Sequence, residues 1–72
     1  MNILGKKLKE ERKNLCMTHN EFSKKLGFSY VTLIKIEKGE YVGPKTIKAL
    51  ANYYNVSTRV IRKEMLTEYE DN

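Results

Sequence analysis

Cysteine, proline, histidine and tryptophan are almost missing from this sequence. Its 72 residues include one cysteine, one proline, one histidine and no tryptophan. A single cysteine excludes an intramolecular disulfide, and one cysteine with one histidine cannot supply the four ligands of a structural zinc site. Scarce proline with abundant lysine is typical of a compact helical protein and not of a disordered chain.

Long hydrophobic runs are lacking as well. No apolar segment approaches the roughly 20 residues of a membrane span. The start, MNILGKKLKEERK, has no signal-peptide core, because charges soon interrupt its few apolar residues. We therefore expect a cytoplasmic protein without membrane association. The length allows one domain with a small core, residues 1–66, and we expect an acidic tail, residues 67–72, to fray.

The charge is spread unevenly along the chain. The formal net charge is +5, but all 14 Lys and Arg lie in residues 1–63, and four of the 9 acidic residues lie in residues 64–72. A basic body of this size favours an anionic partner such as nucleic acid. The alternative is that many small proteins are basic without having such a partner.

Two short helices joined by a tight turn are predicted in the middle of the chain. The first spans residues 19–26, where the spacing of Phe22 and Leu26 puts both on one face. Thr18 precedes this helix and Glu21 follows three residues later. This pair predicts a capping box, in which each side chain accepts a hydrogen bond from the other residue's backbone N–H.

The turn after this helix is expected at Gly27, because glycine adopts a positive φ without steric cost. A second helix is predicted over residues 30–38, with Ser29 as its cap and with Leu33 and Ile36 as its apolar stripe. Helix, glycine turn and helix in this order are the layout of a helix-turn-helix.

The second of these helices leaves an unusual surface outside. On a helical wheel, the side opposite Leu33 carries Val31, Ile34, Lys35 and Lys38 and no acidic residue. A helix in a DNA major groove uses cations for phosphates and guanine, and small apolar groups for thymine methyls. The alternative is a solvated face that happens to include one isoleucine. A basic helix taken alone more often has such a solvated face than a DNA-binding one.

The pattern THNEFS-x3-GFS-x3-L-x2-IE-x-G, residues 18–39, resembles the phage-repressor/Cro-type helix-turn-helix family, also called the xenobiotic-response-element family. The resemblance covers about residues 3–66. It implies an all-α fold, a compact five-helix lambda-repressor-like DNA-binding domain with a central helix-turn-helix. Four residues depart from the family pattern: His19, Ser23, Ile34 and Cys16 stand where Gln, Ala, a polar residue and Gly are frequent. The first and third departures bear on DNA contacts, and the other two are structural.

The resemblance also implies which residues touch double-stranded DNA. The base-reading positions of the family match Tyr30, Val31 and Lys35, with Thr32 close behind. Its phosphate-contacting positions match His19, Ser29, Lys38, Tyr41 and Lys45. Lys35 suits guanine O6 and N7, and Val31 suits a thymine methyl. For His19 the alternative is a plain exposed residue in the first turn of its helix.

A first helix is predicted over residues 3–14. Asn2 is its expected cap, and its apolar stripe consists of Leu4, Leu8 and Leu15. Arg12 lies on the same side as this stripe, and a cation on the core side needs a partner. Glu37, at the edge of the core face of the helix 30–38, is the partner that the resemblance implies. We predict an Arg12–Glu37 ion pair; the alternative is two independent surface charges.

Two further helices complete the expected domain. Pro44 suits the first position of a fourth helix, and Asn55 suits a left-handed end. A fifth helix, residues 58–70, follows Ser57 as its cap, and Met17 and Val56 are expected to join the core from turns. The fifth helix has two apolar edges, of which one packs on the core and the other on a second copy. The expected dimerisation residues are Val60, Met65, Leu66 and Tyr69.

The function that we expect is sequence-specific transcriptional regulation, as a repressor that binds a palindromic operator as a homodimer. The alternative is an antitoxin-type or other interaction module that binds a partner protein through the C-terminal helix. An enzyme is disfavoured, because no nucleophile–base pair, phosphate-binding loop or metal cluster can be assembled from these residues. We therefore expect no catalytic residue, no metal and no cofactor.

Overall fold

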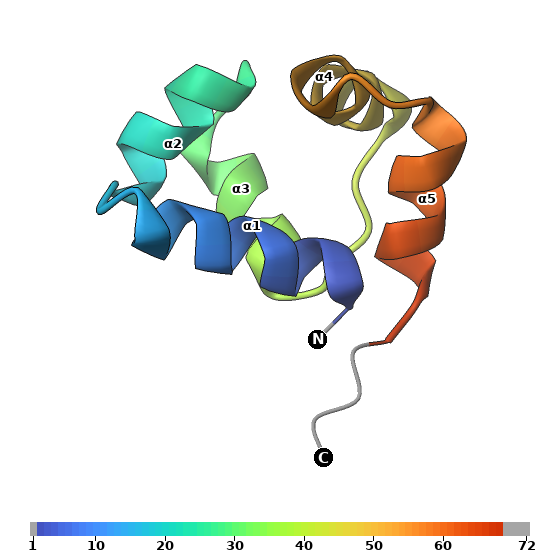
Figure 1. Cartoon of the computed structure of the whole chain (residues 1–72), viewed down its shortest axis with the longest axis horizontal. Coiled ribbons are helices and arrows are strands. Elements are labelled where there is room, and N and C mark those ends of the chain that lie inside the picture. The colour runs from blue at the N-terminus through green and yellow to red at the C-terminus, as the bar shows by residue number, and fades with distance from the viewer. Residues whose placement is uncertain (1, 69–72) are drawn as a thin grey trace.

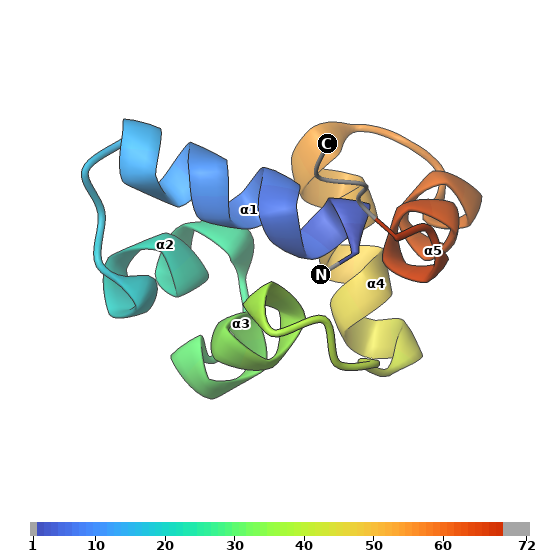
Figure 2. The same cartoon turned by 90° about the horizontal axis from the view of Figure 1, so that it is seen from below.

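The computed structural model describes residues 2–68, which form five α-helices and no strand beyond one isolated bridge. The helices are α1 Ile3–Asn14, α2 His19–Leu26, α3 Tyr30–Glu37, α4 Pro44–Tyr54 and α5 Thr58–Leu66. Figure 1 shows α1 lying across the front of α3, with α2 and α4 above and α5 at the side. Figure 2 shows that α3 and the start of α4 lie on the far side of the molecule from α1. The predicted all-α fold of five helices is confirmed.

The apolar stripes of all five helices meet in one core. The buried hydrophobic residues are Leu4, Leu8, Phe22, Leu26, Leu33, Ile36, Val42, Ile47, Leu50, Ala51, Ile61 and Met65. Each helix alone is too short to be stable in water, so burial of these side chains provides most of the stability. The core therefore fixes the position of α3, whose inward side contributes Leu33 and Ile36.

Local hydrogen bonds set the ends of α2 and α3, as predicted. The Thr18 hydroxyl accepts from the Glu21 N–H at 3.1 Å, and the Glu21 carboxylate accepts from the Thr18 N–H at 2.9 Å. The bond from the Thr18 backbone lowers the pKa of Glu21, because it favours the charged carboxylate. Gly27 has φ 96°, and the Ser29 hydroxyl accepts from the Thr32 N–H at the start of α3.

Gly5 has a role that the sequence did not indicate: it is the point of closest approach between α1 and α3. A Cβ at this position would lie 2.5 Å from the Ile36 carbonyl oxygen and 3.2 Å from Asn2 Oδ1. Asn2 Oδ1 in turn accepts from the Gly5 N–H and caps α1. A glycine inside a helix disfavours the helix by about 1 kcal/mol relative to alanine. Its presence early in a predicted helix was therefore the one signal in the sequence for this role.

Three residues expected in the core lie at its edge instead. Leu15 is 42% exposed, because α1 ends before it and the chain turns away through Cys16 at φ 55°. Val56 is exposed in the turn after Asn55, which has the predicted left-handed conformation. Met17 is only partly buried and packs against the core from outside. A side chain at a helix end is not covered by the helices that enclose the middle.

The end of α5 differs from the sequence prediction. The helix stops at Leu66, and Thr67 is extended, with its carbonyl accepting from the Ile3 N–H at 2.8 Å. Glu68 forms an antiparallel bridge with Asn2. The start of the expected frayed tail is thus hydrogen-bonded to the start of α1, and this long-range pairing replaces further helical turns. Ser57 occupies the cap position of α5 without a side-chain hydrogen bond.

Candidate nucleic-acid interface

Helix α3 presents the surface that the helical wheel predicted. Leu33 and Ile36 are buried in the core, whereas Tyr30 is 50% and Val31 49% exposed, and Lys35 is exposed beside them. The only acidic residue of α3 is Glu37, and it is buried on the inward side. The outward side therefore offers aromatic, aliphatic and cationic groups without a negative charge.

An ion pair fixes the C-terminal end of α3 to α1. Arg12 Nε donates to Glu37 Oε2 at 3.0 Å, and Arg12 Nη2 donates to Glu37 Oε1 at 3.2 Å. Arg12 Nη1 also donates to the Met17 carbonyl oxygen. Both side chains are largely buried, so water competes little for these bonds. The pair thus holds α1, the turn after it and α3 in one arrangement.

His19 also contacts Glu37, and this contact limits how its side chain can bind a phosphate. His19 Nε2 lies 3.2 Å from Glu37 Oε1, so one ring nitrogen faces the carboxylate rather than solvent. We expected His19 at a phosphate; the structure leaves only its other ring nitrogen for that purpose. Glu37 is therefore a shared acceptor for side chains from α1 and α2.

Two hollows flank α3, one on each side. The first, of about 350 Å³, lies between the turn before α3 and the start of α4, and contains Ser29, Thr32 and Lys45 in its lining. The second, of about 320 Å³, is lined by Lys9, Arg12, His19, Ile34, Glu37 and Lys38. Four of the five residues expected to contact phosphates thus line these hollows: Ser29 and Lys45 share one, and His19 and Lys38 share the other.

The expected contact residues differ in solvent exposure and in whether their side chains are already hydrogen-bonded. Lys38, Tyr41 and Lys45 are exposed, and Tyr41 projects from the loop between α3 and α4. The Thr32 hydroxyl lies 3.0 Å from the Ser29 hydroxyl, so these two side chains are hydrogen-bonded to each other at the start of α3. Either hydroxyl has to exchange or share this bond to contact DNA.

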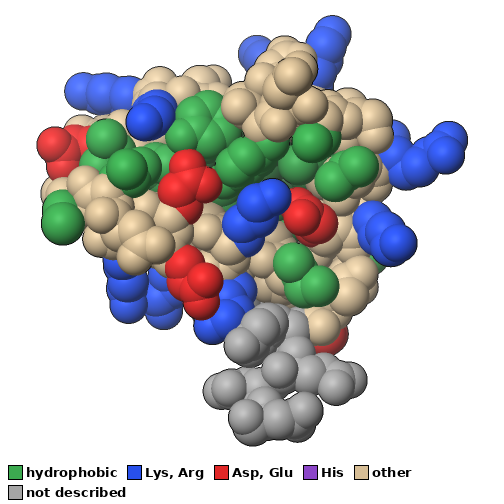
Figure 3. Space-filling model, in the orientation of Figure 1, with side chains coloured by type: hydrophobic (Ala, Val, Ile, Leu, Met, Phe, Trp, Pro, Cys, Tyr) green, Lys and Arg blue, Asp and Glu red, His purple; other side chains and the backbone are tan. Residues whose placement is uncertain are grey.

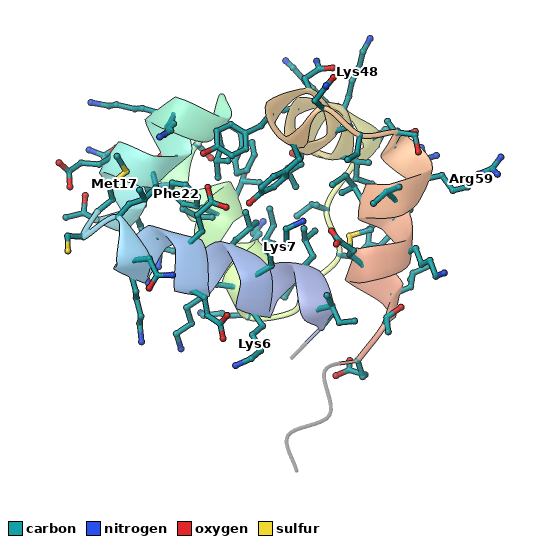
Figure 4. All side chains as sticks on the ribbon, in the orientation of Figure 1. Lys6, Lys7, Met17, Phe22, Lys48 and Arg59 are labelled. Atoms are coloured by element: carbon teal, nitrogen blue, oxygen red, sulfur yellow. The ribbon has the colours of Figure 1, made fainter. Side chains whose placement is uncertain are left out.

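The face turned away from α3 has a different chemistry. Figure 3 shows hydrophobic and acidic side chains in the middle of this face, with most Lys and Arg at its rim. Tyr53 and Tyr54 both donate their hydroxyl hydrogens to the Glu11 carboxylate, at 2.9 and 2.7 Å. Burial, and then the bond to Glu11, raises the pKa of both tyrosines. Lys7 lies over the Tyr54 ring and 3.4 Å from Glu64, and Figure 4 shows it between α1, α4 and α5.

The expected dimerisation residues do not share one surface. Val60 is exposed and Leu66 is 75% exposed, whereas Met65 is 6% exposed and belongs to the core. The assignment of Met65 to a dimer contact was therefore wrong, because its side chain points inward with Ile61 on the core side of α5. Tyr69 lies outside the described residues.

Residues 2–68 contain no group of three or more His, Cys, Asp or Glu side chains that could hold a metal ion. No helix in this part of the chain is long and apolar enough to cross a membrane.

The fold and this surface together define a helix-turn-helix protein. The family model HTH_3, described as helix-turn-helix, matches residues 8–61, which is most of the chain. The chain therefore belongs to the Cro/C1-type helix-turn-helix family of DNA-binding transcriptional regulators. The predicted phage-repressor/Cro-like resemblance and the lambda-repressor-like fold are confirmed. Neither a curated protein nor a solved structure matches this chain.

Proposed function

We propose that this protein is a sequence-specific transcriptional repressor that binds double-stranded DNA with α3 in the major groove. The observation that carries the proposal is the outward side of α3, which exposes Tyr30, Val31 and Lys35, is followed by the exposed Lys38, and has no acidic group. The major groove is about 12 Å wide and admits a single helix. Family membership supports DNA binding as such, and the α3 surface supports this particular docking.

The proposed division of contacts follows the position of each side chain. Tyr30, Val31 and Lys35 are exposed along α3 and are proposed to read base edges, with Thr32 at the margin. The proposed phosphate contacts lie around them and comprise His19, Ser29, Lys38, Tyr41 and Lys45. Phosphate contacts set the register of the protein on the duplex, and base contacts set the sequence preference.

A homodimer is the second part of the proposal. Val60 and Leu66 leave apolar surface exposed on α5, and Figure 2 shows α5 apart from α3, so a second copy can pack there while both α3 helices stay free. A two-fold dimer would bind half-sites about one helical turn, 34–36 Å, apart on a palindromic operator.

Selection of bound duplexes from a random DNA pool at fixed salt tests the proposal. We expect enrichment of a palindromic sequence with two half-sites one helical turn apart. Enrichment of no sequence would contradict specific readout. A reporter gene under the selected site tests the direction of regulation: expression of the protein should lower transcription, and a rise would contradict the repressor assignment.

A further inference from the structure

The second hollow beside α3 contains a residue that we did not expect at the interface. Its lining comes from three helices and the residue that follows α3: Lys9 and Arg12 from α1, His19 from α2, Ile34 and Glu37 from α3, and Lys38 directly after α3. Lys9 precedes Arg12 by three residues, a spacing that places both side chains on one face of α1. That spacing was the signal in the sequence, and without the position of α3 it had no meaning for function.

The free charge of this hollow is positive. The guanidinium of Arg12 is used by Glu37 and by the Met17 carbonyl, and both carboxylate oxygens of Glu37 accept hydrogen bonds. Lys9 and Lys38 are different: within residues 2–68 neither lies in an ion pair. Their two ammonium groups therefore remain available for an anion from outside the protein.

The place of the hollow fits an anion that runs alongside α3. It lies on the α1 side of α3, whereas the hollow with Ser29 and Lys45 lies on the α4 side. A helix in the major groove has one phosphate backbone on each side. The two hollows thus occupy the two sides on which a DNA duplex presents its strands.

We propose that the hollow between α1 and α3 binds a backbone phosphate of one DNA strand, and that Lys9 supplies a cation for it together with Lys38. This inference rests on the proposed docking of α3 and extends the interface to α1. Ile34 is part of the same lining. Its side chain gives the hollow an apolar wall, where an ammonium–phosphate contact is less screened by water than on an open surface.

The salt dependence of duplex binding tests the proposal directly. For Lys9→Gln we expect weaker binding of the selected duplex and of a random duplex by a similar factor, and a salt slope smaller by about one unit. Lys9→Arg keeps the charge and should keep the slope. Arg59→Gln removes an equal charge from α5, where Figure 4 shows Arg59 projecting outward, and should bind like the wild type.

A duplex series with a single neutral methylphosphonate at each position locates the contact. The wild type should lose affinity at one linkage, and Lys9→Gln should lose less there, since only the Lys38 cation then remains for that phosphate. If the wild type binds duplexes and Lys35→Ala weakens them, but Lys9→Gln behaves like Arg59→Gln, this inference alone is overturned. If the wild type binds no duplex, the proposed function fails first, and melting curves establish whether each variant is folded.

Discussion

Arg12 and Glu37 join α1 to the end of α3 through two hydrogen bonds, of 3.0 and 3.2 Å, between a guanidinium and a carboxylate. This two-point geometry holds both the distance and the relative orientation of the two helices. Because α3 carries the proposed base-reading residues, the pair sets how they are presented to DNA. Its importance for orientation is greater than its net contribution to stability, since desolvation offsets much of the attraction.

Glu37→Gln should lower the free energy of unfolding by about 2–4 kcal/mol, because it leaves the largely buried Arg12 without a charged partner. Urea denaturation followed by circular dichroism measures this change. Glu10→Gln is the matched control: Glu10 pairs with Lys6 at 2.9 Å on the surface of α1, and its loss should change stability by less than about 0.5 kcal/mol. Equal effects of the two substitutions would contradict a structural role of the Arg12–Glu37 pair.

Lys35→Ala and Lys38→Ala should separate base reading from phosphate binding. Lys35→Ala should weaken binding of the selected duplex more than binding of random DNA, so the free-energy difference between the two should fall by about 1–3 kcal/mol. Lys38→Ala should weaken binding of all duplexes alike and reduce the salt slope of the binding constant by about one unit. Fluorescence anisotropy at several salt concentrations measures both effects. An equal loss on both kinds of DNA for both variants would show that the division of roles is wrong.

Gly5→Ala should destabilise the protein by about 1–3 kcal/mol, because the new methyl group would overlap the Ile36 carbonyl oxygen and force α1 away from α3. Gly43→Ala is the control: apart from its chain neighbours, no residue comes within 4 Å of its added Cβ, and its φ of −76° suits any residue. We expect little change there, since the weaker cap is offset by lower entropy of the unfolded chain. Thermal melting compares the two, and a Gly5→Ala variant as stable as Gly43→Ala would refute the close contact.

Tyr54→Phe should cost about 1 kcal/mol of stability near neutral pH, because it removes the hydrogen bond to the Glu11 carboxylate. Tyr41→Phe, at a side chain that is 71% exposed, should leave stability without a measurable change. The pKa of Tyr54 is raised in the folded state, so its contribution is complete below the unfolded pKa of about 10 and falls as pH rises further. The stability difference between wild type and Tyr54→Phe should thus narrow above pH 10. A difference that grows there would contradict the raised pKa.

Met65→Ala and Leu66→Ala should act on different properties of the protein. Met65 is buried, so its truncation should cost about 2–5 kcal/mol of stability. Leu66 is exposed, so its truncation should leave the monomer's stability unchanged and should weaken the proposed dimer. Analytical ultracentrifugation with thermal melting measures both quantities. A wild-type protein that stays monomeric at all concentrations would contradict the homodimer.

Local sequence determined where most helices begin and end. Thr18 and Glu21, Ser29, Pro44 and Asn55 lie where their preferences predict, because a cap or a turn depends on atoms within a few residues of each other. The 3.6-residue period likewise separated Leu33 and Ile36 from the outward residues of α3. These signals sufficed for the all-α fold, the helix-turn-helix and the surface of α3.

Long-range packing decided what local sequence left open. The periodic pattern of α5 continues past Leu66, but the helix ends there, where the Thr67 carbonyl accepts from the Ile3 N–H and Glu68 forms a bridge with Asn2. The inward position of Met65 and the closeness of Gly5 to α3 depend on which helices cover which faces, and no short segment contains that information. The same holds for Lys9 and Lys38. They are 29 positions apart in the sequence and line one hollow only because α1 crosses α3.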